Sequence, residues 1–312
     1  MRKSNFLISV VIPVMNEVEN IDPLIEKLKN VLCVYPDHEI IFIDDGSTDE
    51  TLLSLQKNHE KDEKIKYISF SRNFGHQNAL KAGLDYAKGD CVISMDGDFQ
   101  HPPELIPSMV EKWQEGYEIV NTYRQRKTRS GLLKELSSRI FYKLFDFMTD
   151  VNLEEGSADF RLLDRRIVEI LKKFKEKPIF FRGLINWLGF EHYGIKYDPE
   201  ERSAGKTKYS TLKMLKFALE GITGFSVKPL HISISVGAII TFFAFSYGIY
   251  ALIIRIFTDR SIEGWASLLI TISFIGGIQL ITIGIIGIYI GSLFMADKER
   301  PNYIIKEKSD TE

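Results

Sequence analysis

The sequence has little cysteine and no marked excess of charge of either sign. Its two cysteines, Cys33 and Cys91, lie too far apart for a metal-ligand motif and are too few for a disulfide scaffold, so we expect both to fill space in a reducing compartment. The 40 Lys and Arg residues nearly balance the 42 Asp and Glu residues. Because nucleic-acid binding needs an excess of positive charge, this balance argues against a nucleic-acid partner. The chain also lacks internal repeats and low-complexity tracts, and with 45% hydrophobic residues it is not mainly disordered.

Charged residues are missing altogether from two long stretches near the C-terminal end. Neither Pro229–Ile254 nor Gly264–Ala296 contains Asp, Glu, Lys or Arg. A helix that crosses a membrane needs about 20 apolar residues, so we predict a transmembrane hairpin over residues 229–296, with helices at about 232–254 and 265–294. The alternative is a buried helical hairpin of a soluble protein, but such helices are usually shorter and seldom uncharged all round.

The segments that flank this hairpin suggest its orientation. The linker Arg255–Glu263 is short, so both ends of the hairpin must lie on one side of the membrane. Basic residues gather on that side: Lys206, Lys208, Lys213, Lys216, Lys228, Lys298, Arg300, Lys306 and Lys308. The positive-inside rule therefore predicts that both termini and the N-terminal region are cytoplasmic. Residues 211–228 suit an amphipathic helix on the membrane surface, or else a simple connecting helix, and we expect residues 297–312 to form a polar, partly mobile tail.

The first 210 residues alternate short β-rich runs with segments of helical spacing. The expected strands are Ile8–Val14, Glu39–Asp44, Lys66–Phe70 and Cys91–Asp96, and the expected helices are Ile21–Leu32, Thr51–His59 and Gln77–Ala87. Such a series predicts an α/β domain with a mostly parallel sheet, because parallel strands need crossover connections. We also expect Asp22 to cap the first helix with Pro23 in its first turn. The apolar run Phe6–Met15 is interpreted as a buried strand rather than a signal peptide.

Polar residues follow each expected strand at its carboxyl end. These stretches are Pro13–Glu17, Asp44–Ser47, Ser71–Gly75 and Asp96–Gln100. The carboxyl ends of parallel strands share one edge of the sheet, where α/β proteins bind ligands. We therefore expect the four stretches to converge on one rim.

The stretch Asp96–Gln100 has the composition of a divalent-cation site. The carboxylates of Asp96 and Asp98 could both face one cation, and Gly97 between them would permit a sharp turn. The amide oxygen of Gln100 could add a third ligand and leave positions for the oxygens of a diphosphate. An Asp-x-Asp pattern alone is a weak signal, since turns are rich in Asp.

The context of this stretch makes the signal specific. Together with Pro13–Glu17, Asp44–Asp49 and Arg72–His76, the stretch Asp96–Pro103 resembles the motifs of the family 2 glycosyltransferases of the GT-A fold. The paired apolar stretches resemble more closely the bacterial polyprenyl-phosphate glycosyltransferases, the group of the bactoprenol glucosyltransferases and dolichyl-phosphate mannose synthase. The resemblance covers nearly the whole chain. It implies a Rossmann-like GT-A domain over residues 1–210, followed by membrane-surface helices and two transmembrane helices in the bacterial inner membrane.

The resemblance also implies roles for single residues on the donor side. The nucleotide-sugar site would comprise Pro13, Asn16, Glu17, Asp44, Asp45, Ser47, Arg72, Asn73, Gly75, His76, Asp96 and Gly97. Asp96 and Asp98, with Gln100, would hold Mg2+ or Mn2+ against the diphosphate and offset charge on the leaving group. A surface ion pair for Arg72 and turn capping for Asn16 and Asp45 remain the structural alternatives. His101 is expected to be structural.

On the acceptor side the resemblance points to one carboxylate and two basic clusters. Asp159, in the segment Gly156–Arg165, is the candidate base. A lipid phosphate, with a second pKa near 6, is already a competent nucleophile, so Asp159 could instead position the acceptor or simply pair with Arg161. The acceptor phosphate would meet Arg124, Arg126, Lys134, Ser138, Arg202, Lys206 and Lys208, with Gly205 permitting the second cluster to close. Solvated or headgroup-facing charge is the alternative for both clusters.

The expected function is that of a metal-dependent inverting glycosyltransferase. It would move a hexose, with glucose the first candidate, from a UDP-sugar to undecaprenyl phosphate and give a polyprenyl-monophosphate sugar. UDP-N-acetylglucosamine, GDP-mannose or an aminoarabinose donor would give the same reaction class, and a non-catalytic membrane scaffold is the alternative of another class. The sequence leaves the sugar, the preferred metal, the pathway and the oligomeric state open. Small residues would permit close helix packing within one chain or in a homo-oligomer: Gly276, Gly277, Gly284, Gly287 and Gly291.

Overall fold

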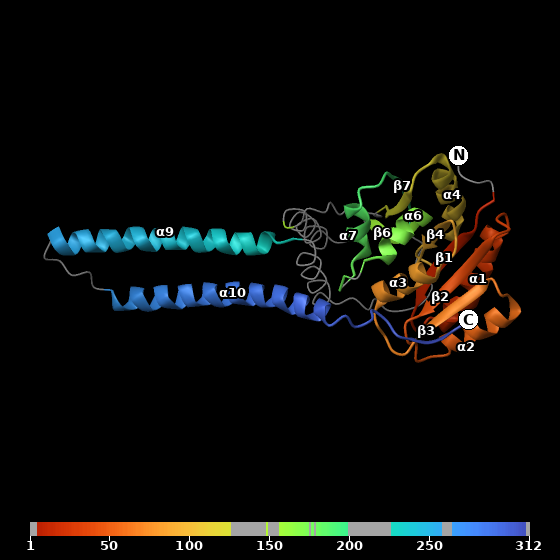
Figure 1. Ribbon diagram of the computed structural model, residues 1–312, viewed down its shortest axis with the longest axis horizontal. Helices are drawn as coiled ribbons and strands as arrows, with labels where there is room; N and C mark the ends of the chain where they lie inside the picture. Colours follow the sequence, from red (N-terminus) through yellow and green to blue (C-terminus); the bar gives the residue numbers. More distant parts are fainter. Residues whose placement is uncertain are drawn as a thin grey trace. The chain divides into compact units, whose positions relative to one another are not determined.

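The computed structural model describes residues 5–125, 148, 156–174, 176–177, 179–198, 226–257 and 264–309 (Figure 1). The chain forms two compact units. The first comprises Met1–Lys143, Val151–Thr211 and Arg300–Glu312, and the second comprises Leu144–Asp150 and Leu212–Glu299. The segment expected to lie on the membrane surface, residues 211–228, falls outside the described residues as far as residue 225.

The first unit is built on a mixed sheet with the order β7-β5-β6-β4-β1-β2-β3-β8. Its strands are β1 Ile8–Val14, β2 His38–Asp44, β3 Ile65–Phe70, β4 Cys91–Ser94, β5 Ile119–Arg124, β6 Ser157–Asp164, β7 His192–Tyr197 and β8 Ile305–Lys308. The pairs β4–β1, β1–β2 and β2–β3 are parallel, whereas β6 and β8 run antiparallel to their neighbours. The predicted parallel core is therefore confirmed, and the expected first strand is the fully buried β1.

Helices cover both faces of this sheet. They are α1 Val18–Leu32, α2 Thr51–Lys61, α3 His76–Tyr86, η1 Pro103–Leu105, α4 Ile106–Glu115, α6 Arg165–Lys172 and α7 Phe181–Trp187. One face joins alternate β1 residues such as Val10 with Leu24 of α1 and Trp113 of α4 in a single apolar cluster. On the other face, α3 comes so close that a Cβ atom at Gly83 would lie 2.0 Å from Val11 Cγ1. Cys91 is buried as expected, but Cys33 is exposed and fills no core space.

The start of the first helix was predicted wrongly. The helix begins at Val18, so Asp22 is not its N-cap and Pro23 lies inside it. The N–H groups at the true start are satisfied from a distant loop: Glu17 N donates to Thr51 Oγ1 (3.0 Å) and Val18 N to Asp49 Oδ2 (3.4 Å). Because those acceptors are more than thirty residues away, the local sequence gave no sign of this start.

The segment after the apolar stretches is not the mobile tail that the sequence suggested. Residues Ile305–Lys308 form β8, which pairs with β3 and completes the sheet of the first unit (Figure 1). Ser71 N donates to Ile304 O (3.0 Å) and Ser309 N to Tyr67 O (2.9 Å), which extends the pairing at both ends. An otherwise open strand edge offers unsatisfied N–H and C=O groups, and these groups fix the tail in place.

This pairing predicts that residues 1–210, the domain expected from the sequence, are not sufficient for full stability. A fragment of residues 1–210 should unfold at least about 6 °C below the same fragment joined by a flexible linker to residues 300–312, because it loses β8 and its side-chain contacts. Thermal unfolding followed by circular dichroism measures the difference. Equal melting temperatures would show that β8 adds nothing to the sheet.

The second unit contains two long apolar helices, α9 Lys228–Phe257 and α10 Trp265–Asp297. Lys228–Tyr250 and Phe274–Asp297 are long and apolar enough to cross a membrane, with mean hydropathies of 1.9 and 2.0. Within this unit the Tyr289 hydroxyl donates to Ser226 O. Among the described residues, a Cβ atom at any of the five glycines of α10 named above would have no atom within 4 Å, so the described part of α9 makes no close contact with them.

Candidate active site

The loops after β1 and β2 are joined by reciprocal hydrogen bonds. Asn16 N donates to Ser47 Oγ (2.9 Å), and Thr48 N donates to Asn16 Oδ1 (2.8 Å). Asn16 has a φ of 53°, a left-handed conformation that Asn tolerates better than most residues. Asp44 accepts Ser47 N (2.9 Å) and Ser69 Oγ (2.8 Å) and so fixes the end of β2. Turn capping, the structural alternative for Asn16, is therefore present, Asp44 caps the turn after β2 in addition, and these hydrogen bonds bring the two predicted stretches together.

Asp45 holds the loop after β3 in the same place. Its carboxylate accepts Phe74 N (2.7 Å) and Gly75 N (3.0 Å). Burial raises the pKa of Asp45 although these two hydrogen bonds oppose the rise. Gly46, with a φ of +71°, permits the close approach, since a Cβ atom there would lie 2.5 Å from the carbonyl carbon of Arg72.

The other predicted donor residues lie around these loops. Pro13 is buried within β1, opposite Ile43 of β2, and the Asn73 amide donates to the Met15 sulfur. The Arg72 guanidinium lies 4.4 Å from the centre of the Phe74 ring, a cation–π contact rather than the ion pair that was the alternative for it.

The acidic loop after β4 is shaped by Phe99 as well as by Gly97. Phe99 has a φ of 62°, which is strained for an aromatic residue, and its ring belongs to the buried apolar cluster. Gly97 is not in a left-handed conformation; its small size matters instead, because a Cβ atom would lie 2.8 Å from Val14 Cγ1. The expected bend at Gly97 is present, and it continues through Phe99, whose left-handed backbone is held by the ring in the core. Asp98 Oδ1 accepts Gln100 N (3.2 Å) within it.

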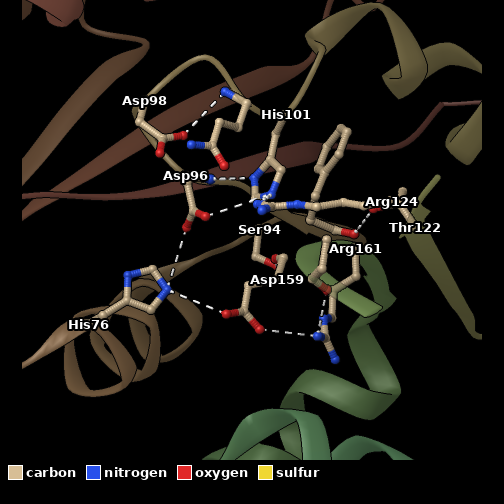
Figure 2. Close-up of polar contacts among 12 residues, drawn as sticks. His76, Ser94, Asp96, Asp98, His101, Thr122, Arg124, Asp159 and Arg161 are labelled. Carbon is tan, nitrogen blue, oxygen red and sulfur yellow. Dashed lines mark hydrogen bonds and ion pairs between the residues drawn. The ribbon is translucent and has the colours of Figure 1, made fainter. Parts of the chain in front are cut away.

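His101 lies at the centre of this site (Figure 2). The ring is fully buried and stacks on Phe160 with 5.3 Å between centroids. Burial lowers the pKa of His101 against the opposing charge of Asp96, so the ring is neutral. Its Nδ1 accepts the Asp96 N–H (2.9 Å), which places the ring hydrogen on Nε2. His101 therefore orients the backbone of Asp96, a candidate cation ligand, whereas the sequence analysis expected only a structural role for it.

Arg124 approaches the same ring without gaining a hydrogen bond from it. Its Nη2 lies 3.1 Å from His101 Nε2, and both nitrogens carry hydrogen. Arg124 Nε donates to the Tyr197 hydroxyl (3.1 Å), which holds the guanidinium at the end of β5. These two contacts place the Arg124 guanidinium beside His101 and the acidic loop.

Asp96 offers an oxygen that is suited to a cation. Its Oδ1 is buried and makes no hydrogen bond in the described structure, and an orphaned carboxylate oxygen is costly unless a ligand meets it. His76 Nε2 lies 3.5 Å from this oxygen and 3.8 Å from Asp159 Oδ2, so His76 stands between the two carboxylates (Figure 2). Among the described residues no group of three or more His, Cys, Asp or Glu side chains forms a complete metal site. Asp96 and Asp98 supply the carboxylate oxygens that a divalent cation prefers, and two such ligands would leave coordination positions for a diphosphate, so their chemistry fits a cation.

Asp159 is a paired anion. Arg182 Nε and Nη2 donate to its two oxygens, each at 2.9 Å, and Arg161 Nη2 lies 3.2 Å from Oδ1. Burial alone would raise the pKa of this carboxyl, but the charge and hydrogen bonds of Arg182, then the charge of Arg161, hold it far below its ordinary value. Burial lowers the pKa of Arg161 to about 10, so it stays protonated near neutral pH. The pairing with Arg161 that the sequence left open is thus present, together with a stronger one.

Arg182 was missed by the sequence analysis. It lies on the short helix α7, whose first N–H donates to Gln77 Oε1 (3.1 Å) on α3, beside His76. The motif Phe181–Trp187 carried no spacing that linked it to Asp159. The acceptor candidates Arg126, Lys134, Ser138, Arg202, Lys206 and Lys208, together with Gly205, lie outside the described residues, so only Arg124 of that set is placed.

Comparison with known proteins agrees with this arrangement. Residues 9–171 match the profile described as Glycosyl transferase family 2. The chain is 41% identical to the uncharacterized glycosyltransferase YkcC of Bacillus subtilis, over 96% of this chain and 93% of that protein. It is 39% identical to the bactoprenol glucosyl transferase of Shigella phage SfV, over 96% and 98% of the two chains. It is 40% identical to the prophage bactoprenol glucosyl transferase homolog of Escherichia coli, over 96% and 97%.

A solved structure shows the same fold at low sequence identity. It is a mannosyltransferase of Pyrobaculum calidifontis in complex with GDP-Man and Mn2+, 16% identical with a TM-score of 0.50. The similarity covers 71% of this chain and 63% of that one, less than two thirds of its length. Such a likeness supports the GT-A architecture of the first unit.

Proposed function

The chain belongs to glycosyltransferase family 2, and on that premise we propose that it transfers a hexose from a UDP-sugar to undecaprenyl phosphate at the cytoplasmic face of a bacterial inner membrane. Glucose is the first candidate for the sugar. The observation that carries the proposal is the convergence of four polar loops on one edge of the sheet, where the buried Asp96 Oδ1 has no hydrogen-bond partner among the described residues.

The donor half of the proposal rests on the loops after β1, β2 and β3. The loop of Asn16, that of Asp45 and the segment Arg72–Gly75 would hold the nucleoside, with the diphosphate directed toward the acidic loop. Asp96 and Asp98, helped by Gln100, would hold a divalent cation, which when bound offsets charge on the departing diphosphate. The mannosyltransferase of the same fold was solved with Mn2+, which supports a divalent cation here without choosing between Mg2+ and Mn2+.

The acceptor half of the proposal rests on the positive charge of Arg124 and on the names of the similar proteins. Arg124 presents a cation beside the acidic loop, and the relatives named bactoprenol glucosyl transferases align over 96% of this chain. The two apolar helices support a location where a polyprenyl lipid is available. In the proposed reaction an oxygen of the lipid phosphate forms a bond to the anomeric carbon as the bond to the diphosphate breaks, and UDP leaves. Inversion follows from this single displacement.

Asp159 has a positioning role in this proposal. A carboxylate whose pKa is held far below its ordinary value is a weak base, and a phosphate monoester that is largely dianionic at neutral pH needs none. The carboxylate of Asp159 instead fixes Arg161 and Arg182 and lies opposite Asp96 across His76.

The reaction can be tested on the purified full-length protein in detergent. Radiolabelled UDP-glucose, UDP-galactose, UDP-N-acetylglucosamine and GDP-mannose would be offered separately with undecaprenyl phosphate and Mg2+ or Mn2+. We expect label in the lipid from UDP-glucose, and none when undecaprenol without its phosphate replaces the acceptor. Labelled lipid from another donor would correct the sugar. A folded protein that labels no lipid from any of the four would contradict the proposal.

A further inference from the structure

Tyr303, in the segment that leads into β8, packs against the end of β3. Its ring stacks on that of Phe70, with 5.1 Å between the centroids and 12° between the planes. Its hydroxyl donates to Asp85 Oδ2 (3.0 Å) on α3, the helix that begins with His76. Burial, together with the charge of Asp85, raises the pKa of Tyr303, so the hydroxyl stays protonated and keeps this bond. The tail thus contacts both β3 and α3.

Phe70 connects Tyr303 to the loop Arg72–Gly75 by packing against Phe74. It is the last residue of β3 and almost fully buried, and its ring meets that of Phe74 edge-on at 5.7 Å. The Arg72 guanidinium covers the Phe74 ring at 4.4 Å. One row of side chains therefore runs from Tyr303 through Phe70 and Phe74 to Arg72. The backbone is tied as well, since Ser71 N donates to Ile304 O.

The loop Arg72–Gly75 has no helix or strand of its own to hold it. Asp45 binds it on one side through the N–H groups of Phe74 and Gly75, and the tail supports it on the other through Phe70. A loop held at both sides has fewer conformations to lose when a ligand binds, so loss of one support should weaken binding.

We propose that Tyr303 is a positioning residue of the donor site: its ring fixes Phe70 and Phe74 and thereby sets the affinity of the loop Arg72–Gly75 for the nucleotide-sugar. The inference rests on the proposed function, in which this loop holds the nucleotide. The segment that follows the apolar hairpin then acts on donor binding without touching the nucleotide-sugar, through the Tyr303 ring and the β3–β8 pairing beside it.

The test compares variants of the full-length protein for the KM of the UDP-sugar, the KM of undecaprenyl phosphate, kcat, and the Kd of UDP by calorimetry. Tyr303→Leu keeps apolar volume and removes the stacked ring. We expect the donor KM and the UDP Kd to rise about three- to tenfold, with the acceptor KM within about twofold, because an aromatic pair contributes on this scale. Tyr303→Phe keeps the ring and should recover most of the donor affinity.

A matched control distinguishes loss of the Tyr303 ring from a general disturbance of β8. Glu307 lies in β8 opposite Ser69, and its side chain accepts a hydrogen bond from Gln56 (3.2 Å). Glu307→Ala changes the same strand but not the stacked ring, so it should leave the donor KM unchanged. The inference is overturned if Glu307→Ala raises the donor KM as much as Tyr303→Leu, or if folded Tyr303→Leu binds UDP as the parent does. Should the Leu variant not fold, Tyr303→Met carries the same comparison, since a flexible Met fills irregular space.

Failure of the inference can be told from failure of the proposed function. Arg72→Gln and Asp45→Asn alter the loop and its anchor directly. If neither raises the donor KM, the donor-site assignment itself is wrong. If both raise it and Tyr303→Leu does not, only the role of Tyr303 is lost.

Discussion

Replacing Asp98 with Ala should, under the proposed function, reduce kcat for sugar transfer by at least about a thousandfold, because the change removes a carboxylate proposed to bind the cation and with it several kcal/mol of transition-state stabilisation. Asp98 stands in the acidic loop two residues after Asp96, whose buried Oδ1 makes no hydrogen bond among the described residues. The measurement is single-turnover transfer at saturating Mg2+ or Mn2+. Raising the metal concentration should restore little of the loss.

The control for this change is another aspartate of the same domain. Asp22 joins α1 to α2 through Ser54 (3.2 Å) and Asn58 (2.7 Å), away from the acidic loop. Asp22→Asn should keep transfer within about twofold of the parent, as expected for a surface substitution. Transfer by Asp98→Ala at the parental rate would show that the cation, if one is bound, is held elsewhere.

The second large effect is expected at Asp159. Asp159→Asn leaves Arg161, only 2% exposed, without its anionic partner, and breaking a buried ion pair in this way typically costs about 3–5 kcal/mol. We expect a clear fall in unfolding free energy and a loss of transfer of about a hundredfold or more. In a double-mutant cycle with Arg182→Gln, the two changes should be far from additive, because the two side chains share two hydrogen bonds.

The pH dependence separates positioning from base catalysis. With its pKa far below the ordinary value, Asp159 stays ionised from pH 5 to 9, so its contribution to folding stability is constant in this range. That contribution declines only at lower pH, where acid protonates the carboxyl in the unfolded chain, which has the ordinary pKa of about 4. The acid limb of the transfer rate should therefore follow the acceptor phosphate, near pH 6. Residual transfer by Asp159→Asn should show the same limb. A limb that disappears with the carboxylate would identify Asp159 as the base.

The parts of the fold that local pattern controls could be predicted from the sequence. Strand β1 was placed with its observed bounds, and the loops after β1 to β4 meet because parallel strands end at one edge. What escaped prediction depends on partners far away in the chain. The start of α1 depends on Asp49 and Thr51, β8 depends on the open edge of β3, and the link from Arg182 to Asp159 joins two elements without a common motif.

In the acidic loop, too, the sequence predicted the features that depend on local pattern and missed those that depend on distant contacts. Its carboxylates were evident from the spacing of Asp96 and Asp98, but the residue that shapes it was not, since nothing local marks Phe99 for a left-handed backbone. That conformation is stabilised by the burial of the ring in the apolar cluster. The neutral state of His101 likewise follows from its complete burial, and the neighbouring sequence does not predict that burial.

The pairing of β8 with β3 also constrains how the chain can thread a bilayer. The paired strands lie before and after the two apolar helices in the sequence. If these helices cross a membrane, both strands must lie on the same side of it, and the number of crossings between them must be even. A chain in which only one helix has inserted leaves residues 305–308 on the far side, and its sheet stays one strand short. An incomplete edge is exposed to proteases and to aggregation. Completion of the sheet would thus depend on correct membrane insertion. Chains with an odd number of crossings would keep an exposed sheet edge and would be the ones degraded or aggregated.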